Sequence, residues 1–204
     1  MGQRFYIHPE NPQIRLLNQA VEVIKKGGVV IYPTDSAYAF GFQLGDKEAM
    51  EKVSRLRQFE KRHHFTLMCS DLSELGTYAV VDNPTFRLIK AHTPGPYTFI
   101  LKGSKELPKR VLNLDRKDVG LRIPDCKITL ALLELLGAPL LSCSVRLSDQ
   151  EGSLSDPDEI FEHFKGQIDL MLDGGSCGDQ LTTVIDLCQD EPVVLRQGKG
   201  EFEF

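Results

Sequence analysis

Small polar residues and arginines stand at the ends of several apolar segments of this 204-residue sequence. Thr34, Arg122 and Arg196 each occupy such a position, and Ser142 and Ser144 close another segment. Hydroxyls and the planar fork of donors on arginine suit carboxylate and phosphate oxygens. The recurrence predicts a site for an anionic small ligand, although each residue taken alone is more typical of a surface or capping group.

These residues can meet only if a sheet brings the strand ends together. Apolar runs predict strands at residues 29–32, 65–69, 97–101, 119–123, 140–144, 168–172, 182–186 and 193–196. Helical spacing and caps predict helices at residues 13–26, 47–57, 84–91 and 129–136, a short helix after 71 and another after 156. Some strands follow each other too closely for a helical crossover. We therefore expect a single α/β domain with a twisted, mixed parallel and antiparallel sheet flanked by helices.

Composition excludes several classes of protein. The formal net charge of −5 argues against a uniformly basic nucleic-acid binder. No stretch is apolar enough to span a membrane, and the first residues lack the apolar region of a signal peptide, so we expect a cytoplasmic protein. The five cysteines include no CxxC pair, and His63 and His64 lack further ligands at suitable spacing. Neither zinc nor a disulfide is therefore expected.

The segment 102–122 is locally basic, and two interpretations stay open. It is either a solvated face, as charge runs usually are, or a surface that meets the phosphates of RNA. The residues that the second interpretation assigns to RNA are Lys105, Lys109, Arg110 and Lys117. No phosphate-binding P-loop and no GxGxxG motif is present, and the glycine-rich stretch 174–178 is more typical of a turn.

A set of ordered motifs carries a resemblance to a known family. The motifs are Gly27-Gly-Val-Val-Ile-Tyr-Pro-Thr-Asp-Ser36, Pro94-Gly-Pro-Tyr-Thr98, Arg122-Ile-Pro124, Pro139-Leu-Leu-Ser-Cys-Ser144, Asp173-Gly-Gly175, Thr182-Thr-Val-Ile-Asp186 and Arg196-Gln-Gly198. In this order they resemble the YrdC-like family of threonylcarbamoyl-AMP synthases over nearly the whole chain. The segments 5–9 and 65–72 are most similar to its YciO branch.

The resemblance implies a YrdC-like fold with a concave face, here over residues 8–198, with terminal extensions at 1–7 and 199–204. It implies synthesis of threonylcarbamoyl-AMP and pyrophosphate from L-threonine, bicarbonate and ATP with Mg²⁺. That product serves the threonylcarbamoyladenosine modification of tRNA, and family members are also described as binding double-stranded RNA.

The resemblance also implies two groups of binding residues. The threonine pocket would use Thr34, Thr66, Arg122, Ser142 and Thr182. ATP or an adenylate would be held by Arg57, Lys61, Ser144, Ser153 and Arg196. No catalytic nucleophile is assigned, because a carbamate that attacks the α-phosphorus requires alignment and charge stabilisation rather than a protein nucleophile.

Two motifs differ from the synthase pattern. Arg57-Gln58-Phe59 stands where the synthases have Lys-x-Arg, and Ser144-Val145-Arg146 stands where they have Ser-x-Asn. Arginine and lysine differ in geometry at a phosphate site, so the two differences are expected to affect the synthase reaction. Three hypotheses follow: an altered synthase, or a hydrolase of a threonylcarbamoyl adenylate or modified adenosine; a tRNA- or double-stranded-RNA-binding module without synthase activity; and a plain small-molecule binder.

Overall fold

The computed structural model describes residues 2–58, 65–108, 111, 117–146 and 153–203. Its helices are α1 (Ile14–Lys25), α2 (Lys47–Leu56), α3 (Ser73–Tyr78), α4 (Asn83–Ala91), α5 (Lys127–Leu136) and α6 (Pro157–Phe164). Its strands are β1 (Gln3–Tyr6), β2 (Val30–Tyr32), β3 (Ala39–Gln43), β4 (Thr66–Met68), β5 (Ala79–Val80), β6 (Tyr97–Gly103), β7 (Asp118–Arg122), β8 (Leu140–Ser144), β9 (Leu170–Asp173), β10 (Thr183–Asp186) and β11 (Val193–Arg196).

Capping residues explain where several helices begin and end. Asp46 accepts from the backbone N–H of Ala49 at the start of α2, as the sequence predicts. Asp156 likewise caps α6, and Gly137 ends α5 with a φ of +70°, the left-handed conformation that glycine adopts most readily. At α3 the N-cap position is Leu72, and Asp71 instead accepts from the backbone N–H of Ser73.

The described strands form one mixed sheet in the order β1-β9-β2-β3-β8-β4-β7-β6-β10-β11, with β5 paired to β6 outside this path. The pairs β1–β9, β9–β2, β4–β7 and β6–β10 are parallel, and the remaining pairs are antiparallel. The predicted mixed sheet flanked by helices is therefore confirmed. β1 lies within the stretch 1–7 and supplies the edge strand next to β9.

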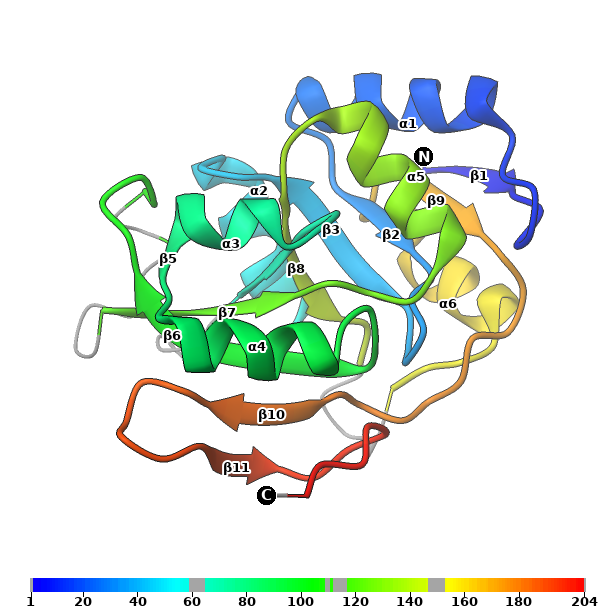
Figure 1. The fold of residues 1–204 in the computed structure, drawn as a ribbon. Coiled ribbons are helices and arrows are strands. Elements are labelled where there is room, and N and C mark those ends of the chain that lie inside the picture. The colour runs from blue at the N-terminus through cyan, green and yellow to red at the C-terminus, as the bar shows by residue number, and fades with distance from the viewer. Residues whose placement is uncertain (1, 59–64, 109–110, 112–116, 147–152, 204) are drawn as a thin grey trace.

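The two faces of the sheet are covered differently. One face carries the larger core, in which Leu67, Phe99 and Leu121 lie among residues of α2, α3, α4 and α6. The other face carries a second core, in which Tyr32 and Met68 lie with residues of α1 and α5. Figure 1 shows α1 and α5 together at one end of the molecule, and α3 and α4 on another side.

The second core covers only part of its face. It includes side chains from β9, β2, β3, β8 and β4, but none from β7, β6 or β10 among the described residues. Since side chains alternate between the two faces of a strand, Thr98, Gly120 and Arg122 point to the part that this core leaves open. This arrangement leaves an open area on the sheet itself. Among the described helices, none is long and apolar enough to cross a membrane.

Candidate functional site

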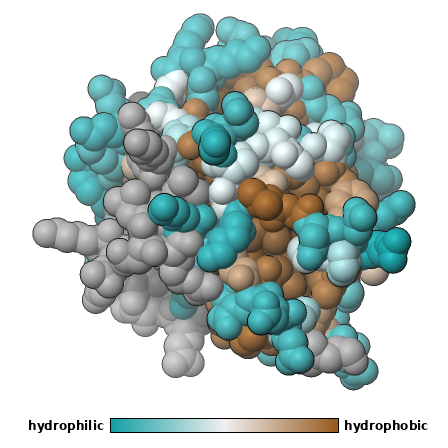
Figure 2. Space-filling model, turned by 60° about the vertical axis from the view of Figure 1, so that its left-hand side comes forward, coloured by the Kyte–Doolittle hydropathy of each residue, from teal (hydrophilic) through white to brown (hydrophobic). Residues whose placement is uncertain are grey.

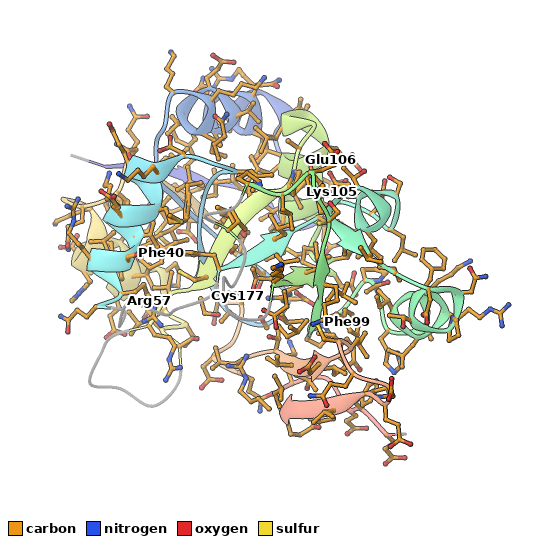
Figure 3. All side chains as sticks on the ribbon, turned by 90° about the vertical axis from the view of Figure 1, so that its left-hand side faces the viewer. Phe40, Arg57, Phe99, Lys105, Glu106 and Cys177 are labelled. Atoms are coloured by element: carbon orange, nitrogen blue, oxygen red, sulfur yellow. The ribbon has the colours of Figure 1, made fainter. Side chains whose placement is uncertain are left out.

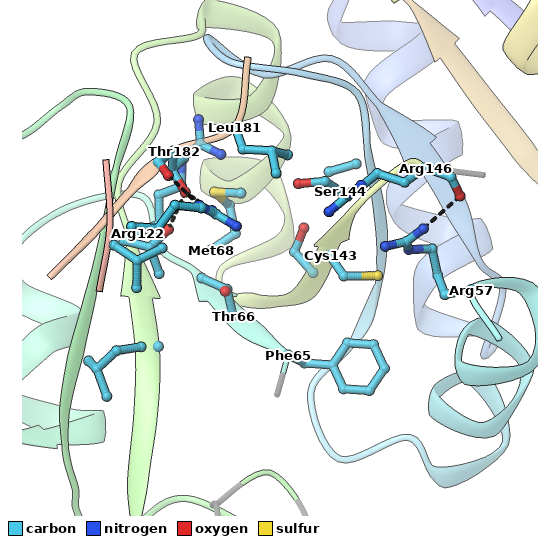
Figure 4. A pocket seen from close by; sticks show the side chains of 17 residues that line it. Arg57, Phe65, Thr66, Met68, Arg122, Cys143, Ser144, Arg146, Leu181 and Thr182 are labelled. Carbon is cyan, nitrogen blue, oxygen red and sulfur yellow. Dashed lines mark hydrogen bonds between the residues drawn. The ribbon is translucent and has the colours of Figure 1, made fainter. Parts of the chain in front are cut away.

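A hollow lies on the open part of the sheet face beside the second core (Figure 4). We call it the hollow throughout. Its lining residues are Ala39, Arg57, Phe65, Thr66, Met68, Thr98, Ile100, Gly120, Arg122, Ser142, Cys143, Ser144, Arg146, Leu181, Thr182, Val184 and Arg196.

Strand register brings the polar lining residues together. Thr66 in β4 is paired with Ser142 in β8 on one side and with Gly120 in β7 on the other. Arg122 is paired with Met68 in the next row of the same face. A Cβ atom at Gly120 would lie 3.3 Å from Oγ1 of Thr66. Because glycine has no side chain, the space between the polar residues of the hollow stays open.

One wall of the hollow contains Thr98, Thr182 and Arg196. The hydroxyls of Thr98 and Thr182 lie 2.9 Å apart and form a hydrogen bond. Arg196 donates from Nε to the carbonyl oxygen of Thr182 at 3.0 Å and from Nη2 to its hydroxyl at 3.2 Å. Burial lowers the pKa of Arg196, and the nearby charge of Arg146 lowers it further. Both hydrogen bonds of the guanidinium thus go to neutral oxygens of Thr182.

The opposite wall contains Arg57, Cys143 and Arg146. Nη1 of Arg57 donates to the carbonyl oxygen of Arg146 at 2.6 Å, and Figure 4 shows the two side chains at the same end of the hollow. Burial lowers the pKa of Arg57, and the charge of Arg146 acts in the same direction. Burial raises the pKa of the Cys143 thiol to about 12, an effect that Arg57 opposes. The thiol is consequently protonated near neutral pH and is a poor nucleophile.

The floor depends on Tyr32, which the sequence analysis did not assign to the site. The hydroxyl of Ser142 donates to the carbonyl oxygen of Phe40 at 2.9 Å. Ser142 Oγ must therefore accept the hydrogen bond of 2.7 Å from the hydroxyl of fully buried Tyr32. The alternating pattern of β2 could have indicated that Tyr32 points to the same side as Val30, but not that it reaches Ser142.

Most of the residues assigned to the ligands lie in the hollow. Of the predicted threonine-binding residues, Thr66, Arg122, Ser142 and Thr182 line it. Thr34 does not line it, but its hydroxyl donates to the carbonyl oxygen of Ala37 at 2.6 Å and accepts from Nη2 of Arg122 at 3.4 Å.

The predicted nucleotide-binding residues divide in a similar way. Arg57, Ser144 and Arg196 line the hollow. Ser153 does not, and its backbone N–H instead donates to the carbonyl oxygen of Asp179 at 3.4 Å. Lys61 lies outside the described residues.

Two of the four residues assigned to RNA, Lys105 and Lys117, are described and lie away from the hollow. Lys105 and Lys117 flank the far ends of β6 and β7, and neither lines the hollow. Figure 3 shows Lys105 well separated from Arg57. The face in Figure 2 carries a hydrophobic band between hydrophilic areas, so its visible described surface is not uniformly polar. Lys109 and Arg110 lie outside the described residues.

Comparison with known proteins gives concordant matches. The sequence model of the Sua5/YciO/YrdC family, described as "Telomere recombination", matches residues 22–198. YciO of Escherichia coli strain K12 is 57% identical over 201 residues, covering 98% of both chains. The threonylcarbamoyl-AMP synthase of Mus musculus is 33% identical over 178 residues, covering 84% of this chain and 62% of the mouse protein.

Solved structures extend these matches. The crystal structure of E. coli YciO superimposes with a TM-score of 0.95 at 57% identity, covering 98% of both chains. The crystal structure of P. abyssi Sua5 complexed with L-threonine superimposes with a TM-score of 0.86 at 26% identity. That match covers 96% of this chain and 57% of the Sua5 chain.

Proposed function

The chain belongs to the Sua5/YciO/YrdC family, and from this premise we propose that its hollow binds L-threonine together with ATP or an adenylate. Relatives named threonylcarbamoyl-AMP synthase and a Sua5 structure that contains L-threonine support this choice of ligands. We further propose that the protein acts in threonylcarbamoyl-adenylate chemistry, the source of the threonylcarbamoyl group in modified tRNA.

The observation that carries the proposal is the grouping of Arg122, Thr182 and Arg196 in one hollow with the hydroxyls of Thr66 and Ser144. Arg122 would hold the carboxylate of threonine, because a guanidinium offers donors in the geometry of that group. Arg196 and Ser144 would contact the phosphates. Separate donors for two anionic ligands in one hollow are the feature that a reaction between an amino acid and a nucleotide requires.

The proposed chemistry relies on alignment and charge stabilisation. Threonine and bicarbonate would give a carbamate with loss of water. The carbamate oxygen would attack the α-phosphorus of ATP as the bond to the β-phosphate breaks and pyrophosphate leaves, and the arginines would stabilise the negative charge that develops on the phosphate oxygens. The high pKa of the Cys143 thiol supports a route without a thiolate nucleophile. Mg²⁺ would enter with the ATP substrate, because this ion is commonly held by substrate phosphates.

Each of the two motifs that differ from the synthase pattern places an arginine in the hollow. Arg57 and Arg146 are lining residues, and the first donates to the backbone of the second. Lysine and asparagine would contact phosphates with different geometry and charge. We therefore propose that product formation is slower than in the synthases that carry Lys-x-Arg and Ser-x-Asn.

The proposal is tested by mass spectrometry of the purified protein incubated with ATP, L-threonine, bicarbonate and Mg²⁺, with an established synthase run in parallel. We expect threonylcarbamoyl-AMP at a lower rate than in the parallel reaction, and faster formation after Arg146→Asn. A matched control, Arg55→Asn, changes an exposed arginine that lies outside the hollow. Absence of product from the wild type and from Arg146→Asn, at protein concentrations at which the control synthase converts all ATP, would contradict synthesis in the forward direction.

A further inference from the structure

The residues that follow β11 fold back onto the start of β10. We call residues 197–203 the tail, and Figure 1 shows it in red beside the orange segment that leads into β10. The backbone N–H of Lys199 donates to the carbonyl oxygen of Leu181 at 2.8 Å, and that of Gly198 donates to Oγ1 of Thr183 at 2.9 Å. A Cβ atom at Gly198 would overlap the carbonyl oxygen of Leu181, so glycine allows this close approach. The backbone of the tail is therefore fixed to the wall of the hollow that contains Leu181.

The side chain of Lys199 extends from the tail to a second segment, the loop of residues 33–38, which we call the Asp35 loop. Nζ of Lys199 donates to the carbonyl oxygen of Asp35. The carboxylate of Asp35 forms an ion pair with Nη2 of Arg122, and both side chains are buried. Lys199 thus connects the tail, which begins directly after Arg196, with the residue that holds the guanidinium of Arg122.

The connection joins parts of the molecule that the sheet does not place side by side. The Asp35 loop follows β2, and the tail follows β11. Strands β3, β8, β4, β7, β6 and β10 lie between these two in the sheet. The hydrogen bonds between neighbouring strands therefore do not directly fix the separation of the Asp35 loop and the tail, whereas the contact made by Lys199 does.

We infer that Lys199 is a positioning residue, which holds the Asp35 loop, and through it Arg122, at a fixed separation from Arg196. The inference rests on the proposed function, which places L-threonine at Arg122 and phosphates at Arg196. It adds how these two donors keep the separation that a reaction between both ligands requires. Lys199 is exposed and is not among the residues that line the hollow, so it acts through Asp35 and not by touching a ligand.

The first test is titration calorimetry of L-threonine and of ATP into the wild type and three variants. Lys199→Met keeps a long unbranched side chain but has no donor for the carbonyl oxygen of Asp35. Its affinity for L-threonine should fall about 3- to 10-fold, because Arg122 is held less firmly. Its affinity for ATP should change by less than about twofold, because the tail keeps its backbone hydrogen bonds.

Two further variants control for the loss of a lysine. Lys199→Arg should restore the affinity for L-threonine, because arginine can donate to the same carbonyl oxygen. Lys90→Met removes an exposed lysine in the last turn of α4, outside the hollow, and should bind both ligands as the wild type does.

The second test is amide hydrogen exchange without any ligand. In the Asp35 loop the backbone N–H groups of Ser36 and Ala37 donate to Oγ1 of Thr34, each at 3.2 Å. These amides should exchange about threefold or more faster in Lys199→Met than in the wild type, because the loop has lost its contact with the tail. Unchanged exchange overturns the inference, whatever the protein binds.

The outcomes separate the inference from the proposed function. Unchanged affinity of Lys199→Met for L-threonine overturns the inference alone, and so does equal weakening of both ligands. A variant Lys199→Arg that binds as weakly as Lys199→Met also overturns it, because the hydrogen bond to Asp35 would then not be the cause. A wild type that binds neither ligand contradicts the proposed function, and with it the role of Lys199 in binding.

Discussion

Two arginines at opposite ends of the sheet have opposite surroundings. Arg4 in edge strand β1 donates from Nε and Nη2 to Asp173, at 3.0 and 2.6 Å, and forms a second ion pair with Asp158. Arg196 in β11 donates to the neutral oxygens of Thr182. Burial acts to lower the pKa of both, but the hydrogen bonds to Asp173 and Asp158 raise the pKa of Arg4, whereas that of Arg196 is lowered.

The difference separates an arginine that serves the fold from one that is available to a ligand. Arg4 forms ion pairs with Asp158 and Asp173 and lies over the rings of Tyr6 and Phe161. Its charge is therefore compensated within the protein and is not available to bind a ligand. Arg196 is partly exposed to solvent, and its hydrogen bonds go to the neutral oxygens of Thr182, so its charge is available to an anionic ligand. The comparison predicts that removal of Arg4 affects stability, and that removal of Arg196 affects binding.

The largest expected effect is on stability at the edge of the sheet. Arg4→Met leaves the carboxylate of Asp173 buried without its cation, which costs about 3–5 kcal/mol of the free energy of unfolding. Urea denaturation measures this loss. A loss below about 1 kcal/mol would show that the ion pair is not the main stabilising contact there.

The next effect is on nucleotide binding in the hollow. Arg196→Met should weaken the binding of ATP by about 10- to 100-fold, because a charge-assisted hydrogen bond is lost, while unfolding changes by less than about 1 kcal/mol. Calorimetric titration and urea denaturation of the same preparation give the two values. Weaker folding with unchanged ATP affinity would reverse the roles that we assign to Arg196 and Arg4.

A smaller effect concerns the Cys143 thiol at high pH. Its pKa is raised from 9.0 to about 12 in the folded protein, so its contribution to stability is complete below about pH 9 and is lost as the pH rises toward 12. Cys143→Ser should lessen the fall in the free energy of unfolding between about pH 9 and 11 by about 1–2 kcal/mol. Parallel pH profiles for the variant and the wild type would contradict the burial of this thiol.

The smallest effect distinguishes two buried tyrosines. Tyr32→Phe removes the hydroxyl hydrogen bond to Ser142. Tyr38→Phe removes the hydrogen bond that the hydroxyl donates to the carbonyl oxygen of Gly175 and the one that it accepts from the backbone N–H of Gly174. Each variant should cost about 1–2 kcal/mol of stability. Only Tyr32→Phe should also weaken L-threonine binding, by about threefold, because Ser142 lines the hollow. If both variants changed the affinity for L-threonine equally, Tyr32 would have no special role in the hollow.

The sequence predicts elements that local chemistry determines. The apolar run before Pro33 gives β2, and the caps at Asp46 and Asp156 start α2 and α6. Strands β1, β3 and β5 are absent from the expectations. β1 and β5 are short, and β3 follows directly on a polar turn, so the pairing that makes them strands comes from distant partners.

The site is predictable in its residue types but not in its geometry. Arg122 and Arg196 could be recognised as candidate donors from their place at strand ends. The register that sets Thr66 between Ser142 and Gly120 depends on strands far apart in the sequence. The contact between Asp35 and Arg122 depends on tertiary packing in the same way, so no local pattern could indicate it.

The most direct test of the account is titration of L-threonine into three proteins in parallel: the wild type, Arg4→Met and Arg122→Lys. We predict that the wild type and folded Arg4→Met bind with equal affinity. Arg122→Lys should bind at least about 10-fold more weakly, because a lysine cannot reproduce the donor fork. Unchanged binding by Arg122→Lys, or loss of binding by folded Arg4→Met, would contradict the claim that the hollow is the ligand site and the sheet edge is structural.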